Sequence, residues 1–435
     1  MWLFKGIIVA LVILSIYLIL FDNFHSFYFS SIVHPLSIYP ILTTALILIG
    51  TNKIKFSSQF NFFYLFVIYA SITTIMSLST EFEMKQTTSY HQGLKGLVSL
   101  IGFSSSIVVF SLFAKNYYDK MLIAAINVAK FIVVFGSLQL FSDLIDLNLL
   151  TNFLKFITGL FSSSTQEIHD RIRLFTHESS WAVSQIVVFI VPVLLLEIIK
   201  NDTLINRSYV FLSLLLLLYT KSGLAILYIF GIFGWFLLKE LRYLILTLRM
   251  KKILLFLPLL IIPIFFTDFF SSFFTYQFNK VSNIIENQGI FQEFSTAARI
   301  GNFYTAILVF LDNPFFGVGL GQFGFYYPDY VPEVFVQGGE ANNWADKFSS
   351  YYATTKSLPA RLLAETGLIG FLFFSLFFYK QISCLRKINT REAKVYMLAL
   401  YGVLIWALNS DSLMQIYVWF IVAMLISYIK NVSKN

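Results

Sequence analysis

Charged residues are scarce in this sequence. Only 12% of its 435 residues are Asp, Glu, Lys or Arg, whereas 57% are hydrophobic and the mean hydropathy is +0.75. A soluble domain carries about 25% charged residues. The composition therefore excludes an ordinary soluble protein and predicts an integral membrane protein. At about 20 residues for each span, the chain is long enough for about a dozen membrane helices.

Cysteine is also nearly absent. Cys384 is the single cysteine, which excludes an intrachain disulfide. The five histidines show no metal-ligand spacing, so neither a metal ion nor another cofactor is expected. The net charge of +8 does not indicate nucleic acid as a partner, because an excess of Lys and Arg in a membrane protein usually marks its cytoplasmic loops. The first apolar run lacks a small-residue cleavage site and is expected to be a membrane span rather than a signal peptide.

Long apolar runs are what the sequence has in abundance. Each is expected to be a helix, because lipid cannot satisfy open backbone groups. Twelve runs are predicted, near residues 3–21, 36–50, 60–79, 94–114, 121–141, 181–199, 208–220, 223–238, 253–267, 359–379, 394–409 and 413–429. The expected fold is an all-α integral membrane protein of about 12 transmembrane helices, with a large outer loop or cap between helices 9 and 10.

This pattern also predicts the domain organisation and the orientation. Helices 1–9 occupy residues 1–267, the large outer loop 268–358, and helices 10–12 with a cytoplasmic tail 359–435. Lys and Arg gather in alternate loops and are absent from 22–35 and 409–413. By the positive-inside rule both termini are cytoplasmic, and the expected location is the bacterial cytoplasmic (inner) membrane.

The outer segment 142–180 is the second long loop. Its apolar positions Leu147, Leu150, Leu154 and Ile157 recur at helical spacing. This spacing predicts a helix that lies in the membrane interface.

The same segment ends in the polar stretch "RIRLFTHESS", residues 171–180. Arg171, Arg173 and Glu178 lie on the predicted outer face, where the positive-inside rule does not explain cations. One interpretation is an outer salt bridge, with Ser179 or Ser180 capping the next helix. The other is an anion site, because arginine grips phosphate through two parallel hydrogen bonds.

A second outer arginine favours the anion site. Ser295 or Thr296 is expected to cap a helix that "DNP" ends at 312–314. Arg299 falls in its first turn, where a cation opposes the helix dipole. Such a placement usually requires a bound anion or an acidic partner, for which Glu293 is a candidate.

Two further outer motifs are weaker. In "YTKSG", Lys221 either extends to the membrane interface or adds a cation to the site. In "GVGLG", residues 317–321, no strand–helix context suits a nucleotide loop, so a tight turn is predicted.

Taken together, these pieces resemble the O-antigen polymerase/ligase superfamily of bacterial membrane glycosyltransferases. The stretch "RIRLFTHESS" matches its first signature in part, with Arg171 and Glu178 in place but Leu174 and Ser179 where the signature has Gly and Pro. The fullest match is a block with these residues: Arg299, Gly301, Ala306, Phe310, Asn313, Pro314, Gly317, Val318 and Gly319. The block "LLAETGLIG", 362–370, is also typical.

One departure separates two activities within the superfamily. Its ligases carry His-Asn shortly before the "LLAETG"-like block, whereas this chain has Lys356 and Ser357, and no histidine follows His177. The resemblance thus favours a Wzy-type polysaccharide polymerase, and an O-antigen ligase is the alternative.

The reaction implied is polymerisation of polyprenyl-pyrophosphate-linked oligosaccharide repeat units, without metal, on the outer face of the membrane. Donor and acceptor are both lipid-linked, and a chain-length regulator protein is a possible partner. The cations expected to bind pyrophosphate are Arg171, Arg173, Arg299 and Lys221. Glu178 is the first candidate for the general base. Further candidate site residues are His177, Glu340, Glu365 and Lys356.

The aromatic residues of the large loop have two interpretations. They stack on sugars, or they form the core of a cap or an interfacial belt; they are Tyr326, Tyr327, Tyr330, Trp344, Tyr351 and Tyr352. A rival function is a lipid-linked oligosaccharide flippase, whose ionisable residues should lie inside the spans. Lys130 is the exception among span middles that otherwise hold almost no charge, which favours an enzyme.

Overall fold

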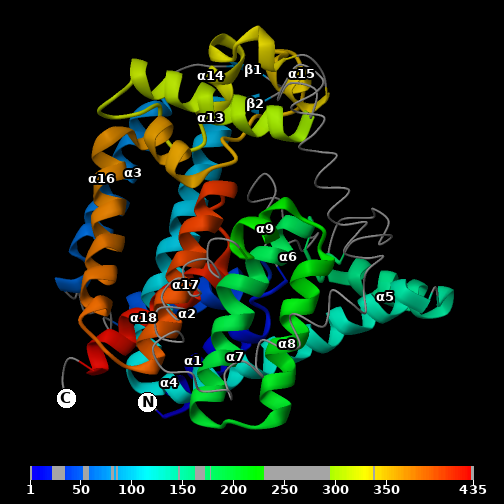
Figure 1. Cartoon of the computed structure of the whole chain (residues 1–435). Coiled ribbons are helices and arrows are strands. Elements are labelled where there is room, and N and C mark those ends of the chain that lie inside the picture. The colour runs from blue at the N-terminus through cyan, green and yellow to red at the C-terminus, as the bar shows by residue number, and fades with distance from the viewer. Residues whose placement is uncertain are drawn as a thin grey trace, which may run out of the picture.

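The computed structural model describes residues 2–21, 35–51, 58–79, 83–84, 87–145, 147–161, 172–176, 178–229, 294–336 and 339–432. Helices dominate these residues. The two strands among them, β1 (Glu83–Met84) and β2 (Thr87–Thr88), form one short antiparallel pair. The predicted all-α class is therefore confirmed in its general form (Figure 1).

Three described helical stretches are long and apolar enough to cross a membrane: Ser89–Asp143, Ser179–Lys200 and Leu358–Arg386. Other helices of the bundle are shorter. These are α1 (Trp2–Tyr17), α2 (Ile38–Gly50), α3 (Asn61–Ser77, preceded by η1, Ser58–Phe60), α8 (Leu204–Tyr219), α9 (Gly223–Tyr228), α17 (Arg391–Asn409) and α18 (Ile416–Val432). They coincide with predicted apolar runs. The predicted run 253–267 and most of 223–238 lie outside the described residues, so the count of about 12 spans stays a prediction.

The longest helix, α4 (Ser89–Ile145), contains two of the predicted runs. Where a loop is expected between 94–114 and 121–141, the helix continues with one non-helical residue, Tyr117 (φ −129°, ψ 25°). Its apolar stretch of 55 residues is roughly 80 Å long at 1.5 Å for each residue. Since a bilayer core is about 30 Å thick, a helix of this length is long enough for both predicted runs, and their division into two spans at Tyr117 stays a prediction.

The stretch Ser179–Lys200 combines three helical segments. They are α6 (Ser179–Gln185), the π-helical turn η2 (Ile186–Ile190) and α7 (Val191–Lys200). Every residue of η2 is buried. A π-turn inside an α-helix shifts the faces of the two halves, so α6 and α7 present different sides to their neighbours.

Helix α18 lies at the centre of the bundle and packs along α4. All residues from Ile416 to Ser427 are buried, as expected of a helix that is apolar on all sides. Its Trp419 ring lies 4.4 Å from that of Phe103 and 5.7 Å from that of Trp406, both in edge-to-face geometry. This packing gives the chain an aromatic core.

A second, smaller group of helices covers one end of the bundle. It comprises α13 (Phe294–Asp312), α14 (Phe323–Tyr330), η5 (Glu333–Phe335) and α15 (Gly339–Ala345). Helix α1 begins and α18 ends at the opposite end (Figure 1). Tyr327 and Trp344 are buried at the centre of this group, with ring centroids 6.3 Å apart. For these two residues the cap-core interpretation holds, and neither presents a face for sugar.

The predicted helix within 142–180 is present as α5 (Asn148–Phe161). Leu154 is buried, whereas Leu149, Phe153 and Phe156 are exposed. Figure 1 shows α5 projecting sideways from the bundle. Its exposed apolar face suits lipid, and its place in the membrane interface stays a prediction.

Candidate active site

A break in helix α16 (Leu358–Arg386) shapes one wall of the site. Gly367 leaves the helical conformation with φ 63° and ψ −172°. Three backbone hydrogen bonds cross from the preceding loop: Val318 N–H to the Ala364 carbonyl (2.9 Å), Gly319 N–H to the Glu365 carbonyl (2.8 Å) and Leu368 N–H to the Pro314 carbonyl (2.8 Å). The loop and the broken helix therefore form one unit.

The "GVGLG" glycines permit this close approach. Gly317, Gly319 and Gly321 all have positive φ, which L-residues with a side chain seldom adopt. A Cβ on Gly317 would lie 2.4 Å from the Glu365 carbonyl carbon, and one on Gly319 would lie 2.1 Å from the Ser77 hydroxyl. The prediction of a tight turn is thus confirmed, with helix α16 as its packing partner.

The first turns of α16 carry a buried ion pair. Arg361 Nε donates to Glu365 Oε2 over 2.7 Å, and the Glu365 side chain is 4% exposed. Arg361 Nη1 also donates to the Asp411 carbonyl over 2.8 Å. The Asp411 carboxylate in turn accepts the Lys356 N–H (3.1 Å) and the Thr355 hydroxyl (3.2 Å). These contacts fix the α17–α18 loop against the segment that enters α16.

Arg299 reaches the same place from α13. Its Nη1 donates to the side-chain oxygen of Asn409, at the end of α17. Within the described part of the chain this neutral amide is its partner, and no carboxylate lies within ion-pair distance. The predicted partner Glu293 lies outside the described residues. The guanidinium charge is therefore not neutralised by a direct contact there.

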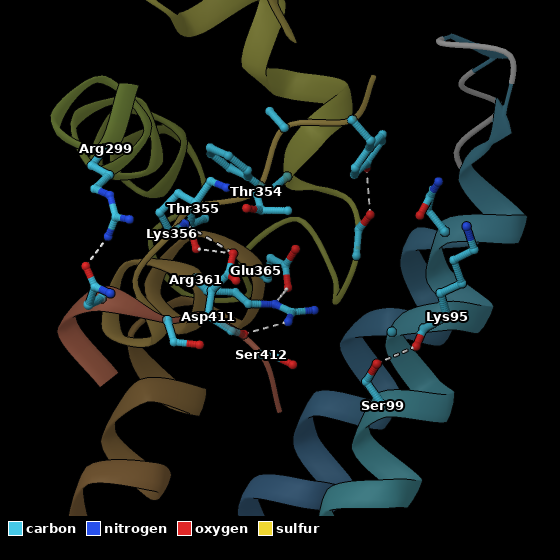
Figure 2. A pocket seen from close by; sticks show the side chains of 18 of the residues that line it. Lys95, Ser99, Arg299, Thr354, Thr355, Lys356, Arg361, Glu365, Asp411 and Ser412 are labelled. Atoms are coloured by element: carbon cyan, nitrogen blue, oxygen red, sulfur yellow. Dashed lines mark hydrogen bonds and ion pairs between the residues drawn. The ribbon is translucent and has the colours of Figure 1, made fainter. Parts of the chain in front are cut away.

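These side chains converge on one pocket of about 110 Å³. Four cations line it, namely Lys95, Arg299, Lys356 and Arg361, together with three carboxylates, Glu178, Glu365 and Asp411. Lys95 and Ser99 lie on α4 at one side, and Arg299, Lys356 and Arg361 lie at the other (Figure 2). Since α13 contributes to its wall, the pocket lies at the end of the bundle covered by α13–α15.

Lys95 differs from the other cations of the pocket. It is partly buried, and among the residues that the structure describes its ammonium has no hydrogen-bond acceptor and no ion-pair partner. Burying part of a charge without a partner costs free energy. The arrangement therefore suits an anion that enters the pocket and completes it.

Glu178 is the most accessible carboxylate of the site. It is exposed and occupies the N-cap position of α6, without a side-chain capping bond. The expectation that Ser179 or Ser180 caps this helix is wrong, because Ser180 instead donates its hydroxyl to Glu178 Oε2 over 3.0 Å. Glu365 is held by Arg361, so Glu178 is better placed to accept a proton.

An aromatic side chain closes another part of the wall. Tyr352 lines the pocket and donates its hydroxyl to the Gly321 carbonyl over 2.7 Å. Burial raises the pKa of this phenol well above its ordinary value, so the hydroxyl stays protonated at neutral pH. Lys356 extends over the Trp344 ring at 5.2 Å and has φ 56°, an uncommon conformation for a residue with a side chain.

The predicted site residues divide into three groups. Glu178, Arg299, Glu365 and Lys356 line the pocket together. Arg173 and Lys221 are described but are not among its lining residues. Three lie where the structure describes no side chain, namely Arg171, His177 and Glu340. Their roles stay predictions.

Sequence reasoning missed Lys95, Arg361 and Asp411. Arg361 carried a signal, because it directly precedes "LLAETG" and stands four residues before Glu365, the spacing of a helical ion pair. Asp411 lies in the short loop 409–413, and nothing local marks its contact with a segment 55 residues earlier. Lys95 looks like an ordinary interfacial lysine until α4 is placed beside α16.

The described residues contain no group of three or more His, Cys, Asp and Glu able to hold a metal ion. Two of the three carboxylates of the pocket are already engaged, Glu365 by Arg361 and Asp411 by the Lys356 N–H and the Thr355 hydroxyl. Its chemistry on the described residues is that of an anion site made by cations.

A helical membrane protein with a cation-lined pocket at one end is the class that fold and site define. Residues 208–375 match the family model described as O-antigen ligase. This domain is consistent with the O-antigen polymerase/ligase superfamily, so the resemblance seen in the sequence is confirmed. Members of the family are membrane glycosyltransferase-like enzymes. No curated protein matches the chain.

Proposed function

We propose that this protein is a metal-independent glycosyltransferase that polymerises polyprenyl-pyrophosphate-linked oligosaccharide repeat units. The observation that carries the proposal is the pocket in which four cations meet an accessible carboxylate. A sugar linked to pyrophosphate brings its own leaving group, so no ATP is needed. Fixed cations stabilise the charge that develops on that group in the transition state.

The reaction uses the pocket residues in distinct roles. A hydroxyl oxygen of the acceptor sugar attacks the anomeric carbon of the donor, and the bond from that carbon to the pyrophosphate oxygen breaks. The hydroxyl proton passes to the Glu178 carboxylate. Arg299 and Lys95 hold the departing pyrophosphate, and the predicted cation Arg171 acts with them. Arg361 is engaged with Glu365 and Asp411, so it positions the wall and adds positive potential.

The polymerase is favoured over the ligase by the residue that precedes α16. Lys356 stands where a ligase-like chain has histidine. The lysine side chain is an ammonium group with three donors and no acceptor, so it does not supply the general base that histidine would provide. Its ammonium lies over Trp344 at the pocket, where it supports phosphate binding instead.

A ligase remains the second candidate, because the matching family model carries that description. Purified protein incubated with one lipid-linked repeat unit separates the possibilities. A ladder of lipid-linked polymers is expected. Transfer only to a different final acceptor would identify a ligase, and movement of the intact substrate across a vesicle membrane without a ladder would identify a flippase.

The proposal places the pocket on the outer face of the cytoplasmic membrane, with both termini inside. It is supported by the absence of Lys and Arg from the short outer loops 22–35 and 409–413 and by the location of α13–α15 opposite the ends of α1 and α18 (Figure 1). In a Cys384→Ser background, cysteines introduced at positions 165 and 340 should react with an impermeant reagent in intact cells. A cysteine at position 389 should not react, and its labelling would overturn the orientation.

A further inference from the structure

A second cavity lies at the other end of the bundle. Its volume is about 550 Å³, within the range of about 300–1,000 Å³ typical of sites for small organic ligands. It is enclosed by the beginning of α1, the end of α2, η1, the Tyr117 break of α4 and the end of α18. It shares no lining residue with the candidate active site.

The walls of this cavity are mainly apolar. Ile8, Leu48 and Val108 contribute aliphatic surface, and Phe60 and Phe113 contribute aromatic surface. Two cations, Lys115 and Lys430, also line it, and both belong to helix segments that terminate or break there. An apolar space bordered by ammonium groups matches a molecule with a hydrocarbon chain and an anionic head.

Two residues that line the cavity also carry a buried polar atom with no hydrogen-bond partner among the described residues. These atoms are the Ser111 hydroxyl and the Gln59 Oε1 atom. Buried polar groups normally have hydrogen-bond partners, so each of these two atoms indicates a partner that the described residues do not supply. Ser111 offers a donor, which suits an ester carbonyl, and Gln59 Oε1 offers an acceptor, which suits a hydroxyl of a head group.

We propose that this cavity is a binding site for an anionic glycerophospholipid whose head group carries hydroxyls, with phosphatidylglycerol as the representative. The phosphate lies between Lys115 and Lys430. The ester region meets Ser111, the head-group hydroxyls meet Gln59, and the start of one acyl chain fills the apolar wall. The bilayer supplies such a lipid at high local concentration, which favours occupancy by mass action.

The position of the cavity gives such a lipid a structural consequence. It contacts α1, α2, α4 and α18 at once, and it lies where Tyr117 interrupts the α4 helix. A bound lipid would join the halves of α4 to the central helix. Removing it should loosen this end of the bundle without altering the pocket lined by Arg299 and Glu178.

Lipid binding to the full-length, delipidated protein in detergent, measured by native mass spectrometry, tests the proposal. The probes are dioleoyl phosphatidylglycerol, dioleoyl phosphatidylcholine and a polyprenyl phosphate. A basic residue near an anionic lipid contributes about a fivefold change in binding. Phosphatidylglycerol should therefore bind about twenty-five-fold more tightly than phosphatidylcholine. Lys115→Gln with Lys430→Gln should abolish that preference.

Lys394→Gln is the matched control. Lys394 is exposed at the start of α17 and does not line the cavity, so its loss should leave the preference unchanged. Ser111→Phe should place a ring in the cavity and weaken the binding of both phospholipids, with thermal unfolding used to confirm that the variant is folded. Equal binding of the two phospholipids by the unmodified protein would overturn the proposal. An effect of Lys394→Gln equal to that of the double variant would do so too.

The chosen lipid class has its own test. Gln59→Leu should weaken phosphatidylglycerol about fivefold, the effect of one hydrogen bond, while leaving phosphatidic acid, which has no head-group hydroxyl, unchanged. Polyprenyl phosphate binding more tightly than phosphatidylglycerol would instead assign the cavity to the lipid carrier and overturn the choice of a glycerophospholipid.

Discussion

Two clusters of charged side chains in this protein differ in how their charges are matched. Away from the pocket, Lys130 on α4 donates to Glu197 Oε1 (2.7 Å) and to Asn206 Oδ1 (3.1 Å), and it lies 5.3 Å from the Tyr209 ring. The active-site pocket has four cations and three carboxylates. Among the described residues there, the hydrogen-bond partner of Arg299 is a neutral amide, and Lys95 has no hydrogen-bond or ion-pair partner.

The difference separates structural charge from functional charge. A charge within membrane helices costs free energy, and the carboxylate of Glu197 on a neighbouring helix offsets this cost for Lys130. Lys95 and Arg299 lack such a carboxylate in the described part of the chain, an arrangement that suits the proposed anionic ligand. Lys130 therefore gives no support to a transporter, although it lies in the middle of a predicted span.

The largest effect on activity is expected from Glu178→Gln. The change keeps the shape of the side chain and removes the proton acceptor, so the polymerisation rate should fall about 10²–10⁴-fold. Initial rates with a purified lipid-linked repeat unit measure it. The same change in the other cluster, Glu197→Gln, should leave the rate for each folded molecule within about twofold. Full activity of Glu178→Gln would show that a residue other than Glu178 is the general base.

Arg299→Ala should produce the next largest loss. A hydrogen bond assisted by charge contributes about 1.5–3 kcal/mol, so the rate should fall about 10- to 150-fold while the protein remains folded. Arg299→Lys should restore little, because an ammonium cannot reproduce two parallel hydrogen bonds. Arg207→Ala is the control, since Arg207 is exposed and paired with Asp202 outside the pocket. Normal activity of Arg299→Ala would show that Arg299 does not bind the leaving group and serves only in packing.

Lys95→Gln should have a smaller effect that is visible in anion binding. Inorganic pyrophosphate is expected to inhibit the enzyme by occupying the pocket, and loss of one ammonium contact should raise its inhibition constant about tenfold. The melting temperature should not fall, because no ion pair is broken. An unchanged inhibition constant would contradict the assignment of Lys95 to the leaving group.

Lys130→Met should affect stability and leave the reaction unchanged. It removes the partner of Glu197, whose Oε2 atom is already buried without a hydrogen bond in the described structure. The free energy of unfolding should fall by about 1–3 kcal/mol. This range is below that for a fully buried pair, because the two side chains are 26% and 15% exposed. Thermal unfolding in detergent measures it, and Lys130→Met with Glu197→Leu should recover part of the loss.

Removal of metal ions should have the smallest effect. The proposed role of the pocket cations is to neutralise the pyrophosphate directly, so polymerisation should continue at an unchanged rate in excess EDTA. Substrate prepared free of divalent ions provides the control. A loss that Mg²⁺ or Mn²⁺ restores would show that the cations of the pocket are not the main electrophilic element.

The sequence predicted those features that depend on composition and local spacing. Apolar runs located α3 and α18 within three residues at each end and α16 at its start, although α16 extends seven residues beyond the predicted run. The spacing of Leu150 and Leu154 located α5. The continuity of α4 through 115–120 was not predicted, because charged residues there look like a loop.

For the candidate site, the sequence pointed to Glu178 and Arg299 from their placement in outer segments, and to Lys356 because it stands where ligases of the resembled superfamily carry histidine. It could not identify Asp411, whose role depends on hydrogen bonds to Lys356 and Thr355 from a distant part of the chain. Lys95 was missed for a similar reason. Lys95 differs from an ordinary interfacial lysine because its ammonium has no hydrogen-bond or ion-pair partner among the described residues. This difference can be seen only when its neighbours in space are known.

The break at Gly367 has a consequence for how the chain is made. Backbone groups of Ala364, Glu365 and Leu368 find partners in residues 314–319 rather than within the helix. During synthesis those partners emerge first, because they precede α16 along the chain. When α16 enters the membrane, the backbone groups at its break can therefore pair with residues 314–319 at once. They do not depend on a segment that is synthesised later. Co-translational docking of this helix should thus depend on residues 314–319, and a loop variant such as Gly317→Val, whose Cβ would lie 2.4 Å from the Glu365 carbonyl carbon, should leave these backbone groups of α16 without partners.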